Sequence, residues 1–189
     1  MKTDYSDIIE RVLIDEESLK LKIKQLAKTI NSHYENKDTL ILVGILKGSV
    51  MFMAELAKSL NIDLKMDFMV VSSYAENTYS SGNVKILKDL DIDIKDKEVL
   101  IVEDIIDTGY TLKKTKENLI NREAKDVRIV TLLDKPERRE VDIKPDWTGF
   151  KIPNEFVVGF GLDFDQMYRN LPYIGVVKRS FYENIEDAK

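Results

Sequence analysis

The feature that most constrains the fold of this chain is a buried strand that runs through an acidic turn into a helix. Val99–Val102 is an unbroken apolar run rich in β-branched residues, which is typical of a central strand of a parallel sheet. Glu103 and Asp104 follow directly, and apolar residues then recur at helical spacing across Leu112–Ile120. Ligands of open α/β sheets bind outside the carboxyl ends of the strands, so this turn is the first place to expect a site.

The loop between strand and helix has the composition of a phosphate-binding loop. Asp107-Thr108-Gly109-Tyr110-Thr111 places hydroxyl groups and a glycine where backbone N–H groups and the positive helix end are free. No Gly-Lys-Ser/Thr closes the loop, so it is not a nucleoside-triphosphate P-loop. Glu103 and Asp104 would repel a phosphate beside them and suit sugar hydroxyls or a hydrated metal ion. The whole loop therefore favours a ribose 5-phosphate; Glu103-Asp104 taken alone would favour a solvated acidic turn.

The run from Val99 to Leu112 resembles the phosphoribosyl-diphosphate motif of the phosphoribosyltransferases, in particular those of the hypoxanthine-guanine type. The resemblance extends over residues 41–178. It implies a Mg²⁺-dependent transfer of the phosphoribosyl group from phosphoribosyl diphosphate to hypoxanthine or guanine, giving the nucleotide and pyrophosphate. We expect Asp107 to be the catalytic residue that accepts the proton of purine N7. The phosphoribosyl-binding residues expected from the motif are Glu103, Asp104, Asp107, Thr108, Gly109, Tyr110 and Thr111.

Composition sets the class of protein. The chain has 189 residues, 43% of them hydrophobic, which fits a single domain with a substantial core. It has no cysteine, no apolar run of membrane-spanning length and no signal-like start, so we expect a cytoplasmic protein that binds no membrane. Its net charge of −5 argues against nonspecific binding to nucleic acid.

Two further segments precede the central strand. Asp15 is predicted to cap an amphipathic helix that ends near Tyr34, where the only histidine, His33, is expected at the surface with nothing around it. A second buried strand, Thr39–Leu46, is predicted to run through Lys47-Gly48-Ser49 into a helix over Val50–Leu60. Strand, glycine turn and helix again make an anion site, although a solvated loop lysine is equally compatible with the triplet. The resemblance places pyrophosphate on Lys47 and Gly48, often with a cis peptide before the lysine.

A long polar loop is predicted over Ser72–Gly82, between strands Met66–Val71 and Val84–Leu87. Such a loop in a compact domain is more often functional than accidental. It resembles the family's lid, in which Ser73 and Tyr74 close over the diphosphate. An ordinary mobile hairpin loop is the alternative.

The next predicted strand, Val127–Leu133, delivers Lys135 to the same sheet edge as the phosphate loop. The resemblance implies that Lys135 binds the 6-oxo group of the purine. Arg138 and Arg139 are expected to be solvated, and Trp147 is expected to pack an irregular segment.

The C-terminal third supplies the remaining expected site residues. Phe156–Asp163 is predicted to be a short strand, and Ile174–Val177 another. The resemblance implies stacking of the purine between Phe156 and Ile105, and reading of its edge near Val157. It also implies a metal contact by Asp163, which we group with Glu103 and Asp104 as metal ligands and also count among the purine-binding residues. A pyrophosphate contact is implied for Arg169. Asp165 and Gln166 lie in a variable stretch, and we assign no role to them.

The sequence thus predicts an α/β domain over 1–189, with a mainly parallel sheet flanked by helices in the type I phosphoribosyltransferase fold. A small hood subdomain is expected from the chain ends and part of 135–172. A homodimer or homotetramer is expected. Two alternatives remain: a regulator of the same fold that binds nucleic acid, and the same chemistry selective for xanthine or adenine.

Overall fold

The apolar run predicted to be the central strand lies at the centre of the main sheet. A computed structural model describes residues 5–73 and 84–186 of the chain. Within them, β5 (Glu98–Ile106) lies between β2 (Leu40–Leu46) and β6 (Asp126–Asp134) and pairs with both in parallel. The four residues Val99–Val102 have no exposed surface. This is the environment expected of a strand that is covered on both faces.

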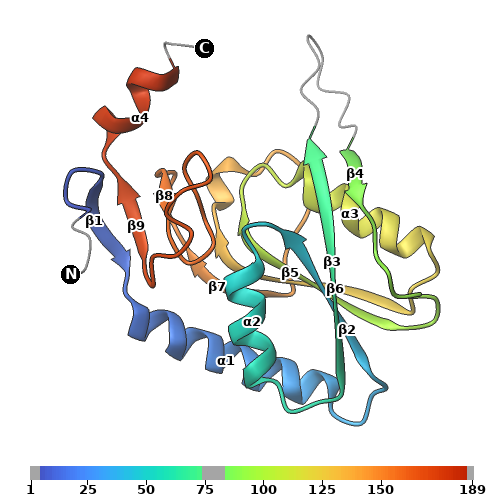
Figure 1. Cartoon of the computed structure of the whole chain (residues 1–189). Coiled ribbons are helices and arrows are strands. Elements are labelled where there is room, and N and C mark those ends of the chain that lie inside the picture. The colour runs from blue at the N-terminus through green and yellow to red at the C-terminus, as the bar shows by residue number, and fades with distance from the viewer. Residues whose placement is uncertain (1–4, 74–83, 187–189) are drawn as a thin grey trace.

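The main sheet has the strand order β4–β3–β2–β5–β6–β7 (Figure 1). Every neighbouring pair is parallel except β3 with β4, which is antiparallel. The prediction of a mainly parallel sheet is therefore confirmed. The remaining strands of this sheet are β3 (Leu64–Ser73), β4 (Val84–Lys88) and β7 (Trp147–Lys151).

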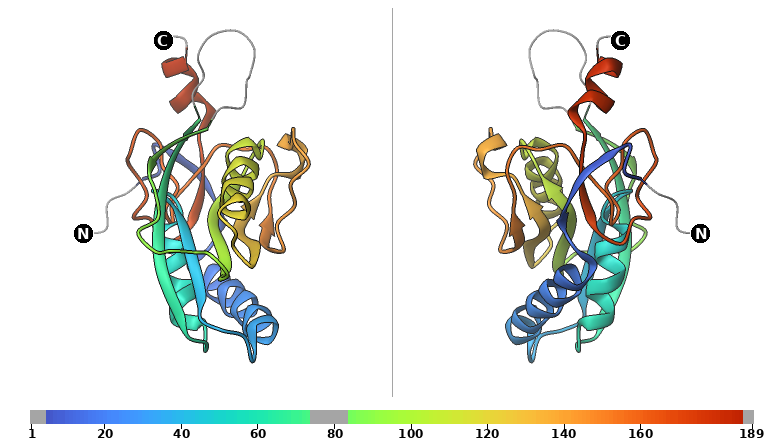
Figure 2. Two further views of the ribbon diagram at one scale, coloured as in Figure 1. Left: turned by 90° about the vertical axis from the view of Figure 1, so that its right-hand side faces the viewer. Right: turned by 90° about the vertical axis from the view of Figure 1, so that its left-hand side faces the viewer.

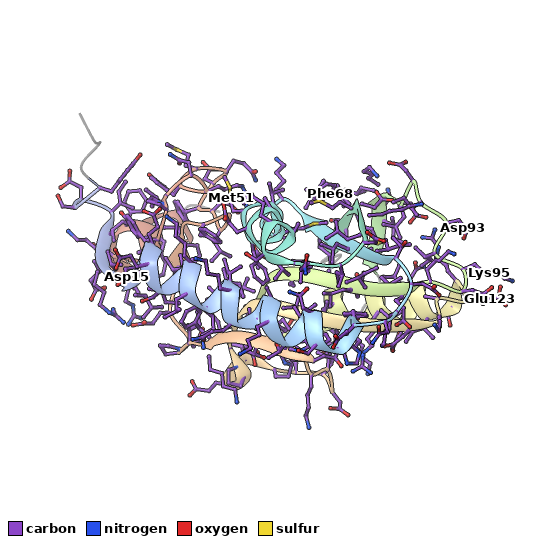
Figure 3. All side chains as sticks on the ribbon, turned by 90° about the horizontal axis from the view of Figure 1, so that it is seen from below. Asp15, Met51, Phe68, Asp93, Lys95 and Glu123 are labelled. Carbon is purple, nitrogen blue, oxygen red and sulfur yellow. The ribbon has the colours of Figure 1, made fainter. Side chains whose placement is uncertain are left out.

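Helices cover both faces of the sheet. α1 (Glu16–Tyr34) and α2 (Val50–Ser59) pack in the core cluster of one face, and α3 (Tyr110–Asn121) packs in that of the other. Asp15 caps α1 as predicted, because its Oδ1 accepts a hydrogen bond of 2.7 Å from the Ser18 amide. Figure 3 shows α1 and α2 side by side, with Asp15 at one end of the molecule and Lys95 and Glu123 at the other.

A second, smaller sheet joins the two ends of the chain. β1 (Ile9–Ile14) pairs antiparallel with β9 (Ile174–Val177), which pairs antiparallel with β8 (Val157–Val158). β1 was not predicted, because its charged residues interrupt the apolar pattern. Helix α4 (Arg179–Glu186) follows β9 and projects beyond this sheet (Figure 2). No helix in the described ranges is both long and apolar enough to span a bilayer.

Three local predictions were wrong. Trp147 begins the edge strand β7 rather than packing an irregular segment, because the free edge of β6 offers it a backbone partner at Val130. Only Val157 and Val158 of the predicted strand Phe156–Asp163 are extended. The chain then turns at Gly159, Phe160 and Gly161, all of which have positive φ angles. His33 does have neighbours, since its ring contacts the rings of Tyr34 and Trp147 edge-on.

Candidate active site

A cavity of about 310 Å³ opens at the carboxyl end of β2 and β5, the edge at which the sequence predicts a site. Most of the predicted residues meet there. Those that line the cavity are Lys47, Gly48, Glu103, Asp104, Ile105, Asp107, Thr108, Gly109, Thr111, Asp163 and Arg169. Tyr110, Lys135, Phe156 and Val157 do not line it. Ser73 ends β3, and Tyr74 lies outside the described residues.

The acidic pair at the end of β5 is only partly satisfied by hydrogen bonds within the protein. Oε2 of Glu103 is buried and has no hydrogen-bond partner among the described residues. Burial, and then the neighbouring charge of Asp104, hold the pKa of Glu103 well above its usual value. Burial also raises the pKa of Asp104 to about 6, although hydrogen bonds from the backbone amides of Ile105 and Asp104, and then the Arg169 charge, oppose this shift. Two carboxylates kept this way favour an added cation or hydroxyl donor.

Gly48 is required by the position of Asp104. A Cβ on Gly48 would lie 1.7 Å from Asp104 Oδ2, so any side chain there would displace the carboxylate. The peptide bond between Leu46 and Lys47 is cis, in the place where the resemblance led us to look for one. The Lys47 ammonium donates a hydrogen bond of 3.0 Å to Gln166 Oε1. The turn after β2 therefore brings a cation and a bare backbone beside the acidic pair.

The loop after the acidic pair ends at the first turn of α3. Gly109 occupies the capping position with φ of 91°, a left-handed conformation that favours glycine. The first turn carries no acidic side chain. Its backbone N–H groups therefore present the positive end of the helix to the cavity without a competing carboxylate. This arrangement suits a phosphate group.

The side chain of Asp107 is held by a residue that we expected to be solvated. Arg138 Nε donates a hydrogen bond of 2.9 Å to Asp107 Oδ1. Arg139 NH1 donates one of 2.9 Å to the Asp107 carbonyl, and its NH2 pairs with the buried Asp134. The prediction that Arg139 is solvated was wrong, because a buried carboxylate requires a partner. The Lys-Pro-Glu-Arg-Arg run after a strand was the signal that could have indicated this.

Lys135 lies beneath the same loop. It is 9% exposed, and its backbone N–H donates to the Ile106 carbonyl at 3.0 Å. Burial lowers the pKa of its ammonium, while the negative charges of Asp107 and Glu155 act in the opposite direction. An ammonium that is largely removed from water favours a site where an acceptor is supplied by a ligand.

Phe156 is 37% exposed, and one ring face is already covered. It stacks on Tyr182 of α4 with ring centroids 5.1 Å apart and an interplanar angle of 27°. Tyr182 was missed by sequence reasoning, because contacts between distant aromatic residues leave no local pattern. Val157 is buried and Ile105 is half-buried. The ring of Phe164 also packs edge-on against Phe156, with the centroids 5.5 Å apart, and the remaining exposed part of the Phe156 ring is the part that a ligand could contact.

Asp163 and Arg169 form a local network rather than isolated binding groups. Arg169 NH2 lies 2.8 Å from Asp163 Oδ1, and the backbone N–H of Gln166 donates a hydrogen bond of 2.8 Å to Asp163 Oδ2. Gln166 Oε1 accepts hydrogen bonds from both Lys47 and Arg169. The sequence offered no reason to assign a role to Gln166, but its side-chain carbonyl joins the two cations of the predicted pyrophosphate site.

The donor set can be tested for fit to Mg²⁺. No group of three acidic or histidine side chains in the described residues converges closely enough to hold a metal by itself. Mg²⁺ commonly binds through one or two carboxylates, with water and substrate oxygens completing its shell. The unpartnered oxygen of Glu103 and the adjacent Asp104 fit that role. Asp163 is engaged with Arg169 and Gln166 and is a poorer candidate.

Comparison with known proteins gives consistent results. Residues 13–165 match the model of the phosphoribosyl transferase domain family. The chain is 58% identical to a hypoxanthine-guanine phosphoribosyltransferase of Lactococcus lactis, over 96% of this chain and 98% of that protein. The similar protein of Bacillus subtilis is 52% identical, over 93% of this chain and 97% of its own length. A crystal structure of a hypoxanthine phosphoribosyltransferase from Staphylococcus aureus superposes with a TM-score of 0.92 at 48% identity, covering 96% and 98% of the two chains.

Proposed function

The chain belongs to the phosphoribosyltransferase family, and from this premise we propose that it is a purine salvage enzyme. It transfers the 5-phosphoribosyl group of phosphoribosyl diphosphate to N9 of hypoxanthine or guanine, and releases pyrophosphate. The observation that carries the proposal is the acidic pair Glu103-Asp104, with one oxygen on Glu103 that is buried and unpartnered among the described residues, beside an open helix N-terminus. Sugar hydroxyls or a metal satisfy the carboxylates, and a phosphate satisfies the helix end. A ribose 5-phosphate carries both hydroxyls and a phosphate, and the residues that suit these two groups lie a few positions apart in the chain.

We assign the binding steps to three sets of groups. The 5-phosphate binds the N–H groups of the turn and the hydroxyls of Thr108 and Thr111. The ribose hydroxyls bind Glu103 and Asp104. The diphosphate binds Lys47, the Gly48 backbone and the Arg169 guanidinium, whose planar fork suits phosphate oxygens; Ser73 and Tyr74 are assigned to its lid.

The chemical step requires stabilisation of positive charge and removal of a proton. Positive charge develops at the sugar C1 as pyrophosphate leaves, and the carboxylates of Glu103 and Asp104 stabilise it electrostatically. Asp107 accepts the proton of purine N7, because its carboxylate faces the cavity between the sugar and phosphate positions. Mg²⁺, held by Glu103 and Asp104, neutralises diphosphate charge when it is bound. Water exclusion is assigned to the loop over 72–82.

Base selection is assigned to Lys135, with Phe156 and Ile105 against the purine faces and the Val157 backbone at its edge. An ammonium is a donor only, so it pairs with a 6-oxo group and opposes the 6-amino group of adenine. Sites built on such a pairing discriminate by about 10⁴-fold or more.

A panel of purine bases tests the proposal. We expect kcat/KM for hypoxanthine or guanine to exceed that for adenine by about 10⁴-fold, and Lys135→Met to narrow this gap. Xanthine as the preferred base would change the substrate but not the chemistry. Equal wild-type values for adenine and hypoxanthine would contradict the assignment of Lys135.

Nucleic-acid regulation is the second candidate, and the acidic charge balance of the chain disfavours it, with a sequence pI of about 5.1. We propose instead a cytoplasmic single-domain enzyme in which the second sheet is the hood.

We also propose that it forms a homodimer or homotetramer. Exposed apolar side chains at Val50 and Met51 of α2 and Met66 of β3 support this; Met51 and Phe68 lie on one side in Figure 3. Sedimentation analysis of the Met51→Glu variant tests the oligomer, because the mass of the particle in solution should be smaller than that of the wild type.

A further inference from the structure

The base-recognition segment and the loop that carries the proton acceptor are joined by two arginine side chains. Arg138 and Arg139 follow Lys135 in the chain. Arg138 is the last residue of the short 3₁₀ helix Pro136–Arg138, and Arg139 comes directly after it. Both reach back to Asp107, one to its carboxylate and the other to its backbone. The two contacts address different atoms of one residue, so they can be separated by substitution.

Arg139 is the more buried of the two arginines. Its side chain is 15% exposed, and that of its partner Asp134 is 8% exposed. Its guanidinium divides its donors, giving NH2 to Asp134 and NH1 to the Asp107 carbonyl. A planar fork can serve both acceptors at once, whereas an ammonium concentrates its donors at one point. Arg139 therefore fixes the position of the loop backbone relative to β6.

Backbone contacts hold the same two segments together. The Glu140 amide donates to the Thr108 carbonyl at 3.0 Å, and the Lys135 amide donates to the Ile106 carbonyl at 3.0 Å. Gly109 lies directly against the arginine, because a Cβ there would be 3.1 Å from Arg139 Cδ and 3.2 Å from its NH1. The carbonyl groups of Ile106, Asp107 and Thr108 therefore all accept hydrogen bonds from the segment that follows β6. The N–H groups of the loop are left for the cavity.

Arg138 acts on the side chain instead. Its Nε contacts Asp107 Oδ1 at 2.9 Å, and both side chains are about half exposed. An exposed ion pair contributes little to stability, because water and salt screen it. It can still select one orientation of the carboxylate, in which Oδ1 is occupied and Oδ2 remains available.

We propose that Arg138 and Arg139 are positioning residues for Asp107: Arg139 sets the backbone of the phosphate loop, and Arg138 orients the carboxylate that accepts the purine proton. This inference rests on the proposed function, since it presumes that Asp107 accepts that proton. It implies different kinetic effects. Displacing the backbone weakens phosphoribosyl diphosphate binding, whereas freeing the carboxylate slows the chemical step with binding intact.

The experiment measures kcat and both KM values for single variants. For Arg138→Ala we expect kcat to fall about fivefold with both KM values unchanged, the upper range for an exposed pair. For Arg139→Met we expect KM for phosphoribosyl diphosphate to rise roughly tenfold to hundredfold, as a displaced substrate-positioning group does. Arg139→Lys should behave as Arg139→Met does, because charge alone does not restore the second hydrogen bond. Arg139→Met joined with Asp134→Asn leaves no unpaired buried charge and reports the same KM effect if the single variant folds poorly.

A double-mutant cycle tests whether Arg138 acts through Asp107. In an Asp107→Asn background, Arg138→Ala should have no further effect on kcat, because the carboxylate it orients is gone. Arg128 is a matched control, since it pairs with Asp126 and Asp146 at the opposite end of β6. Arg128→Met should leave kcat and both KM values at wild-type levels.

The outcomes separate this inference from the proposed function. Wild-type protein without transferase activity contradicts the function itself. Active wild type with unchanged constants in Arg138→Ala and Arg139→Met contradicts the inference only. An equal kcat loss from Arg138→Ala in both backgrounds also contradicts it, because Arg138 would then act independently of Asp107.

Discussion

Two acidic sites on the same sheet have opposite environments. Asp67 of β3 is 5% exposed, and its carboxylate accepts hydrogen bonds from the amides of Phe68, Asp91 and Ile92 at 2.7–2.8 Å. Burial alone would raise its pKa, but these amides and the Lys88 charge outweigh burial and lower it. Glu103 and Asp104 of β5 have raised pKa values instead.

The difference indicates which carboxylates serve the fold and which serve a ligand. A structural carboxylate is satisfied within the protein, so that its charged form stabilises the native state. A carboxylate kept for a ligand remains undersatisfied until the ligand arrives, at a cost to the fold. Asp67 has the first pattern and Glu103-Asp104 the second.

The largest effect that this comparison predicts is in the loop after the acidic pair. Asp107→Asn preserves shape but cannot accept the N7 proton, so kcat should fall by about 10²–10⁴-fold, the usual contribution of a general base. Substrate binding and thermal unfolding should remain close to wild type. Steady-state kinetics with hypoxanthine checks this, and near wild-type kcat would rule out Asp107 as the proton acceptor.

Gly48→Ala tests the position of the Asp104 carboxylate without removing a charge. The new Cβ would overlap Asp104 Oδ2, so the carboxylate must move. A displacement of about 1 Å can cost 10²-fold in rate, and we expect kcat/KM to fall by about that factor. A Gly44→Ala variant is not a suitable control, because its Cβ would overlap Met53 in the core. Full activity of Gly48→Ala would show that Asp104 tolerates displacement.

Asp67→Asn should have the opposite profile. One amide donor would face the backbone N–H groups that the carboxylate now accepts, so the free energy of unfolding should fall by about 1–3 kcal/mol. Turnover at 25 °C should be retained, since Asp67 lies away from the cavity lining. Asp93→Asn is the matched control, because Asp93 is exposed and, among the residues that the structure describes, accepts a hydrogen bond only from the Lys95 amide. Urea titration of both variants gives the comparison; equal unfolding free energies would contradict it.

The smallest predicted effect is a difference in pH dependence. The pKa of Asp104 is raised in the folded state, so its contribution favours folding at low pH and is lost as pH rises from its ordinary value of 3.8 to about 6. The pKa of Asp67 is lowered, so its contribution is present above 3.8 and is lost as pH falls below that value. Without metal, Asp104→Asn should gain stability over wild type as pH rises to 6, whereas Asp67→Asn should lose stability. Equal pH profiles for the two variants would contradict the assignment.

Much of this arrangement was predictable from the sequence, because strand, turn and helix signals are local. Val99–Val102, the capping residue Asp15 and the loop Asp107–Thr111 were predicted from residue types and spacing. The contacts of Arg139 and Gln166 were not, since each joins segments whose proximity depends on the tertiary fold. The same holds for Tyr182 against Phe156.

The edge strands show the same limit. β1 was missed because its alternating charged residues pair with β9 only after the chain ends meet. Trp147 was assigned to an irregular segment because a short edge strand has no distinctive apolar run. In both cases a partner strand far away in sequence determines the structure, and no local propensity reveals it.

The most direct test of the central claim is a crossed measurement on Glu103→Gln and Asp67→Asn, with unfolding free energy and kcat/KM for hypoxanthine determined for each. We predict that Glu103→Gln leaves the unfolding free energy unchanged or raises it, since the neutral amide avoids the cost of burying a carboxylate, and lowers kcat/KM by roughly tenfold or more. Asp67→Asn should lower the unfolding free energy and leave kcat/KM close to the wild-type value. Loss of stability with full turnover in Glu103→Gln would contradict the account, because Glu103 would then serve the fold as Asp67 does.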